Sequence, residues 1–234
     1  LSRAGFDVMS VATNHIKDCG RMKGWCNETF FDTLGNLERV GIHTLGGGED
    51  LQAALQPLVI TLNGVRFGFV ALGDSKMDES VFATETNPGI ARLDAANIRA
   101  AVDAARQVSD VVIALPHWGS EENFVPNWNQ RTQAQQLAAA GADLVVGNHT
   151  HVVQAIQEVD GVPVFYGLGN FVFDQWYTDH RQGVILLVKF RGTEYAGYEL
   201  IPVQHTQEGR VSLAAPDVAE QLLENIRKAG EALR

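Results

Sequence analysis

Runs of β-branched and aromatic residues alternate with stretches of helical periodicity along the first part of the chain. A helix is predicted over residues 29–40, where Phe30, Leu34 and Leu37 recur at helical spacing, and another begins after the capping residue Asp94. The other elements predicted here are strands over 6–12, 111–115 and 144–147 and a helix over 129–140. This alternation is typical of strand-helix-strand units around a largely parallel sheet.

Turn dipeptides indicate that other strands pair in the antiparallel sense. Asn63-Gly64 and Asp160-Gly161 each supply the two positive-φ positions of a tight hairpin. The strands predicted around these turns and beyond them cover 58–62, 65–72, 152–159, 162–168, 184–190 and 198–203. The last four of these strands predict a second, more antiparallel sheet. With a closing helix over 217–233, the sequence favours an α/β fold of one domain, residues 1–234, built on two sheets.

The composition is that of a globular domain and argues against membrane-spanning and nucleic-acid-binding proteins. Hydrophobic residues make up 45% of the 234 residues, as in globular domains, and no apolar run approaches the ~20 residues of a membrane span. A net charge of −10 argues against nucleic-acid binding and implies that an anionic substrate needs a local cation such as a metal. Cys19 and Cys26 do not match a zinc-site spacing, and we expect two thiols, with a single bridge as the alternative for an exported protein.

Histidines follow three separate predicted strands. Asn14-His15 follows the first strand, His117 the strand at 111–115, and His149 and His151 the strand at 144–147. In α/β sheets, ligands bind beyond the carboxyl ends of the strands, so these side chains predict a metal site. Each histidine taken alone is more simply explained as a hydrogen-bonded structural residue.

The residue types suggest which metals and which roles. Imidazole with amide oxygen suits zinc, manganese, iron or nickel. His149 and His151 are two residues apart, so in an extended segment both project to one face, and each can ligate one of two metals. Asn14 can ligate through its amide oxygen. His15, the next residue of an extended chain, projects to the opposite side and is better suited to donate a proton than to bind the metal.

These and further motifs resemble the CapA family of capsule or poly-γ-glutamate synthesis proteins, which have a calcineurin-like metallophosphoesterase fold. The resemblance covers essentially the whole chain. The motifs that carry it are Asn14-His15, His117-Trp118-Gly119, residues 147–151 (Gly-Asn-His-Thr-His), residues 166–174 (Tyr-Gly-Leu-Gly-Asn-Phe-Val-Phe-Asp), residues 87–91 and residues 140–145.

The resemblance implies a four-layer α/β/β/α sandwich of two mixed sheets with two divalent metal ions. It implies that Asn14, His117 and His149 serve one metal and His151 the other. Asn14 and His15 would belong to the catalytic machinery, with His15 protonating the leaving group.

The chain also departs from the family pattern. Two family motifs, Gly-Asp and Asn-Leu-Glu, supply acidic ligands and should precede Asn14, where only thirteen residues stand. We therefore expect the N-terminal portion of the fold to be missing and the remaining ligands to hold one ion weakly. The run Gly35-Asn36-Leu37-Glu38 repeats the second motif but lies inside the helix predicted over 29–40, so we interpret it as helical.

Two further sets of residues are candidates for binding an anionic substrate. Asn170 and Asp174 lie in the family-like segment and either hydrogen-bond the substrate or brace the histidine loop. Lys17, Arg21 and Lys23 form either an anion-binding collar or a solvated basic stretch.

The function indicated is metal-dependent hydrolysis of a phosphoester or a γ-glutamyl amide during capsule or poly-γ-glutamate synthesis. The alternative is a non-catalytic accessory protein that binds poly-γ-glutamate. The expected partners are an anionic substrate and a capsule-synthesis membrane complex, without nucleic acid. The resemblance also leads us to expect a place in the cell envelope, outside the cytoplasm.

Overall fold

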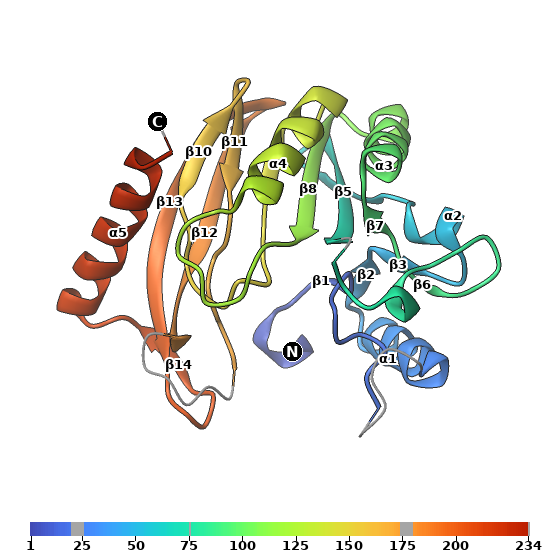
Figure 1. Ribbon diagram of the computed structural model, residues 1–234, viewed down its shortest axis with the longest axis horizontal. Helices are drawn as coiled ribbons and strands as arrows, with labels where there is room; N and C mark the ends of the chain where they lie inside the picture. The colour runs from blue at the N-terminus through green and yellow to red at the C-terminus, as the bar shows by residue number, and fades with distance from the viewer. Residues whose placement is uncertain (20–25, 75, 174–179, 234) are drawn as a thin grey trace. The chain divides into compact units, whose positions relative to one another are not determined.

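Strands and helices alternate in the computed structural model of the chain much as the sequence pattern predicts (Figure 1). The structure describes residues 1–19, 26–74, 76–173 and 180–233. Two compact units are formed, one by Leu1–His117 with Ala139–Ala142 and the other by Trp118–Ala138 with Asp143–Arg234. In the described part of the chain, the helices are all too short or too polar to cross a membrane.

The first unit is centred on strand β5 (Val65–Asp74), which is buried over most of its length. Strand β4 (Leu58–Leu62) pairs with it in the antiparallel sense, and strands β8 (Val111–His117) and β7 (Arg92–Leu93) pair with it in parallel. The predicted hairpin is confirmed, because Asn63 and Gly64 have φ angles of 51° and 83°.

Helix α3 (Ala95–Val108) packs on β5 and β8 (Figure 1). Asp94 caps it as predicted, accepting a hydrogen bond from the Asn97 main-chain nitrogen at 2.9 Å. The buried face of the helix consists of Ile98, Ala101, Val102 and Ala105, which recur at helical spacing.

A smaller parallel pair begins the first unit. Strand β1 (Val8–Ser10) pairs with β2 (His43–Leu45), so the strand predicted over 6–12 is shorter than expected. Helix α1 (Asn27–Arg39) connects the two and confirms the helix predicted over 29–40. The remaining short elements of this unit are η1 (Ser2–Ala4), β3 (Gly47–Gly48), α2 (Leu51–Ala54), η2 (Glu79–Val81) and β6 (Gly89–Ile90).

The second unit contains a mixed sheet and an antiparallel sheet. Strand β11 (Val162–Phe165) pairs in parallel with β9 (Leu144–Val146) and in the antiparallel sense with β10 (Ile156–Val159). These strands are shorter than predicted, because residues 152–155 and 166–168 belong to loops joined by one bridge, Val153 to Leu168. Asp160 and Gly161 form the predicted turn, with φ angles of 50° and 83°.

The second sheet of this unit is antiparallel, as predicted, but the strands predicted over 152–159 and 162–168 do not belong to it, because β10 and β11 join β9. It consists of β12 (Gln182–Arg191), β13 (Glu194–His205) and β14 (Val211–Leu213). Helix α5 (Pro216–Glu231) follows it (Figure 1). The Leu222 and Ile226 side chains of this helix form a buried cluster with Val153 and Val184. With α4 (Trp128–Ala140) matching the helix predicted over 129–140, the predicted α/β class with mixed sheets is confirmed.

Candidate functional site

Asn14 and His117 lie in contact in the first unit, although 103 positions separate them in the sequence. The Oδ1 atom of Asn14 is 2.9 Å from Nε2 of His117. His117 is buried and Asn14 is partly buried. An amide oxygen and an imidazole nitrogen from distant parts of the sequence thus lie within hydrogen-bond distance of each other.

The contact joins the turn after β1 to the end of β8, a strand of a different sheet. β5 and β8 are parallel with Gly73 opposite His117, so both strands end at the same edge of the sheet. Asn14 belongs to the turn that follows β1, where the Thr13 main-chain nitrogen donates to Val11 O at 2.8 Å. The expectation that these two strand ends meet is therefore confirmed within this unit.

His15 is the most exposed of the candidate residues, with 61% of its side chain accessible. Its Nδ1 lies 2.7 Å from Oδ2 of Asp18, and the Asp18 main-chain nitrogen donates to His15 O at 3.0 Å. The sequence analysis missed Asp18, although a carboxylate three residues after His15 can contact the imidazole within one turn. The carboxylate holds the Nδ1 proton, which directs Nε2 of the imidazole outward.

Lys17 is buried and does not form part of an exposed basic collar, so the collar expectation is wrong for this residue. Its Nζ donates to Ser80 O at 2.9 Å and to Pro88 O, and burial lowers the pKa of the ammonium group. Lys17 instead ties the turn that carries Asn14 to a neighbouring segment. The other two collar candidates, Arg21 and Lys23, lie outside the described residues.

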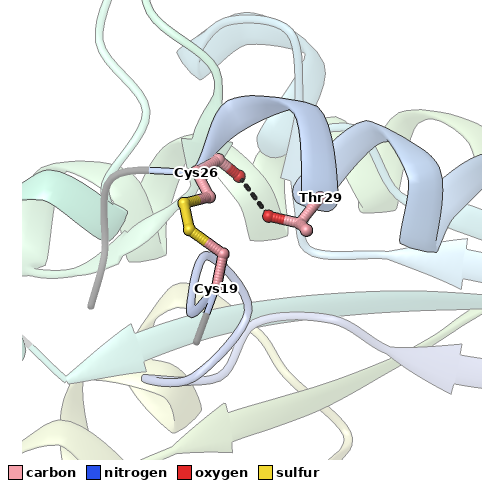
Figure 2. Close-up of a disulfide and its surroundings, with 3 residues drawn as sticks. All are labelled: Cys19, Cys26 and Thr29. Carbon is pink, nitrogen blue, oxygen red and sulfur yellow. Dashed lines mark hydrogen bonds between the residues drawn. A yellow bond between two sulfur atoms is a disulfide. The ribbon is translucent and has the colours of Figure 1, made fainter. Parts of the chain in front are cut away.

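A disulfide joins Cys19 to Cys26, so the expectation of two thiols is wrong and the alternative of a bridge holds (Figure 2). Cys26 is the residue that precedes α1, and its main-chain oxygen accepts a hydrogen bond from Oγ1 of Thr29 at 2.9 Å. The bridge therefore fastens the end of the His15–Asp18 turn to the first turn of α1.

His149 and His151 lie together in the second unit, with ring centroids 6.4 Å apart. The backbone between them is not extended as expected, because their φ angles are 91° and 60°. Non-glycine residues with such left-handed angles cost of order 1–3 kcal/mol each and persist where surrounding contacts fix them. The rings are neighbours because the loop turns back on itself.

Gly147 allows two side chains to support this loop. A Cβ atom at Gly147 would collide with Nε1 of Trp118 and with Tyr166 O. Trp118 is fully buried, and its Nε1 donates to Tyr166 O at 2.9 Å. Burial raises the pKa of the Tyr166 hydroxyl to about 12, and that hydroxyl lies 3.0 Å from Oε1 of Gln157.

Asn170 lies in the same unit as His149 and His151 and is buried. Its side chain contacts His151 and the main chain of His180. Asp174, the other residue predicted to bind substrate, lies outside the described residues.

Imidazole nitrogen and amide oxygen are ligand types that suit divalent transition metals. Two ligands at right angles, each about 2.1 Å from one cation, have donor atoms about 3.0 Å apart. The 2.9 Å between Asn14 and His117 matches that spacing. In the part of the chain that the structure describes, no group of three or more His, Cys, Asp or Glu side chains could hold a metal.

A family model described as "Bacterial capsule synthesis protein PGA_cap" matches residues 1–175. The PGA biosynthesis protein CapA of Bacillus subtilis (strain 168) is 32% identical over 205 residues, 87% of this chain and 52% of that protein. The "Probable polyglutamine synthesis accessory protein MT0602" of Mycobacterium tuberculosis (strain CDC 1551 / Oshkosh) is 32% identical over 177 residues, 71% and 45% of the two chains. The chain thus spans about half the length of the curated relatives it matches.

Solved structures show the same fold at low sequence identity. The NAD nucleotidase NadN of Haemophilus influenzae matches with a TM-score of 0.50 and 18% identity over 96% of this chain and 46% of that one. The sulfate thiohydrolase SoxB of Thermus thermophilus, in complex with glycerol, matches with a TM-score of 0.55 and 18% identity over 97% and 37%. The chain therefore shares its fold with parts of these two larger proteins.

Proposed function

Because this chain belongs to the PGA_cap family of bacterial capsule synthesis proteins, we propose that it is a metal-dependent hydrolase of capsule or poly-γ-glutamate synthesis. Its substrate in this proposal is an anionic phosphoester or a γ-glutamyl amide. The observation that supports the proposal most directly is the 2.9 Å contact between Asn14 and His117, two potential ligands from distant parts of the sequence.

The proposed ligands are Asn14 and His117 in the first unit and His149 and His151 in the second. When bound, divalent transition metals supply the positive charge that this acidic chain otherwise lacks, polarising the substrate oxygens and activating water. Manganese, zinc, iron and nickel all suit the donor set, and the family fold favours two ions in the complete ligand set.

His15 is the proposed general acid. Its Nε2 gives a proton to the departing oxygen or nitrogen, while Asp18 holds the other ring proton at Nδ1. Its exposed ring can reach a substrate, and the turn bond from the Asp18 nitrogen to His15 O keeps the pair together. Asp18 is thus a positioning residue for His15.

The test is turnover of a phosphoester and of a γ-glutamyl anilide by the purified chain at saturating Mn²⁺ or Zn²⁺. A positioned general acid contributes typically ~10²–10⁴-fold, so His15→Ala should lose that much. His43→Ala, which alters an exposed histidine of β2 outside the proposed site, should retain full turnover. Equal turnover by both variants contradicts the proposal, and the products distinguish phosphoester from amide cleavage.

The second candidate function is non-catalytic binding of poly-γ-glutamate within a capsule-synthesis membrane complex. The name of the mycobacterial relative, an accessory protein, favours it. In this case the chain binds the polymer in the presence of metal, and His15→Ala changes neither binding nor a background rate of hydrolysis.

We also propose that the protein acts in the cell envelope, outside the cytoplasm. The Cys19–Cys26 disulfide supports this, because disulfides persist mainly in oxidising compartments. Alkylation of cells before reduction should leave both cysteines unlabelled, whereas labelling of both would contradict an oxidising location.

A further inference from the structure

The side-chain amide of Asn170 is held at both ends within the second unit. Its Oδ1 lies 2.9 Å from Nδ1 of His151, and its Nδ2 donates to His180 O at 2.9 Å. The side chain is buried, so neither end exchanges these partners freely for water.

These two contacts fix which ring nitrogen of His151 carries the hydrogen. A main-chain oxygen only accepts, so the end of Asn170 that faces His180 O must be the NH₂ group. Oδ1 then faces His151 and also only accepts, so Nδ1 of His151 must be the donor. In the neutral ring, Nε2 consequently has no hydrogen and offers its lone pair.

The position of Asn170 is itself fixed by the main chain. Its main-chain nitrogen donates to Gln182 O at 3.2 Å. Gly183 lies so close that a Cβ atom there would be 2.5 Å from Asn170 O. Asn170 is therefore attached to the start of β12 and cannot follow a rotating His151 ring.

His151 is constrained from other directions as well. Its φ angle of 60° places the residue in a left-handed conformation, and its ring centroid lies 4.8 Å from that of Phe173. Asn170 supplies the directional contact among these constraints, because a hydrogen bond distinguishes Nδ1 from Nε2 whereas a ring contact does not.

We infer that Asn170 is a positioning residue that holds His151 in the Nδ1–H tautomer and presents Nε2 as a metal ligand. The inference rests on the proposed function, in which His151 binds a metal. Outer partners of ligating histidines typically contribute roughly 10–100-fold to metal affinity. The sequence left two roles open for Asn170, substrate binding and bracing of the histidine loop, and the inferred role is the second.

The first measurement needs no variant. Long-range ¹H–¹⁵N spectra of the metal-free chain at about pH 8, where an ordinary imidazole is neutral, report the tautomer of each histidine. We expect Nδ1 of His151 to be protonated and Nε2 to be bare. A predominant Nε2–H tautomer would overturn the inference.

The second measurement compares two variants of similar size by Zn²⁺ titration. Asn170→Asp keeps an acceptor for His151 and loses the donor to His180 O, whereas Asn170→Leu loses both. We expect Asn170→Leu to lower Zn²⁺ affinity by roughly 10–100-fold and Asn170→Asp to preserve both affinity and tautomer. Equal loss in both variants would mean a purely structural role through His180 and would overturn the inference.

His151→Ala separates this inference from the proposed function. Unchanged Zn²⁺ affinity in His151→Ala would refute the ligand role and, with it, the purpose assigned to Asn170. Weaker affinity in His151→Ala with unchanged affinity in Asn170→Leu would refute only the role of Asn170.

Discussion

Replacing Gly147 by alanine tests how the histidine loop is supported. The added Cβ atom would overlap Nε1 of Trp118 and Tyr166 O, so the indole ring must move. The movement breaks the buried 2.9 Å hydrogen bond between these two residues. Gly147→Ala therefore disturbs both the packing and the polar contacts beneath His149.

The expected loss of stability has two parts. Forcing an extra carbon into a packed interior costs typically about 1–3 kcal/mol. Leaving a buried indole N–H without its partner costs about 1–3 kcal/mol more. We therefore expect the free energy of unfolding of the second unit to fall by about 2–6 kcal/mol.

Urea unfolding followed by tryptophan fluorescence measures the change. Gly35→Ala is the matched control, because Gly35 lies in α1 with no atom within 4 Å of the added carbon. Alanine in place of glycine within a helix stabilises by about 1 kcal/mol, so the control should change in the opposite direction. A Gly147→Ala protein as stable as the unmodified chain would refute the reasoning about this close approach.

Three further changes have defined outcomes. The Arg66 hydrogen bonds lower the pKa of Asp110 from 3.8 to about 2, so its contribution to stability is complete above about pH 4 and is lost as the pH falls towards 2. The urea midpoint of Asp110→Asn should hence decline less over that range than the midpoint of the unmodified chain. The Cys19–Cys26 bridge closes a short loop, with a sequence separation of 7. From the loop entropy, reducing the bridge should lower the free energy of unfolding by about 2.5 kcal/mol. An unchanged urea midpoint in the presence of reductant would contradict this. Asp94→Ala should cost about 1 kcal/mol through loss of the α3 cap, and a thermal scan showing no decrease would exclude that role.

Local signals predicted most of the elements. Asn63-Gly64 forms its hairpin because the two residues tolerate positive φ angles, and Asp94 begins a helix because its side chain accepts from the first turn. The sequence also placed Asn14 and His117 after two separate strands that were expected to end close together, and the contact agrees with this, although β1 and β8 belong to different sheets.

What the sequence could not predict depends on contacts between distant segments. The burial of Lys17 follows from two main-chain oxygens more than sixty positions away, which no local pattern encodes. The left-handed angles of His149 and His151 are backbone conformations that neither residue favours locally. Cysteine spacing alone left the choice between thiols and a bridge open, and the fold brings Cys19 and Cys26 together.

Zn²⁺ titration of the isotope-labelled chain, monitored through its imidazole resonances, tests most directly whether the proposed histidine ligands bind metal. We expect the signals of His117, His149 and His151 to shift together at high metal concentration, while His43 and His205 do not respond. Shifts spread evenly over all the histidines, or no shift at His117 and His151, would contradict it.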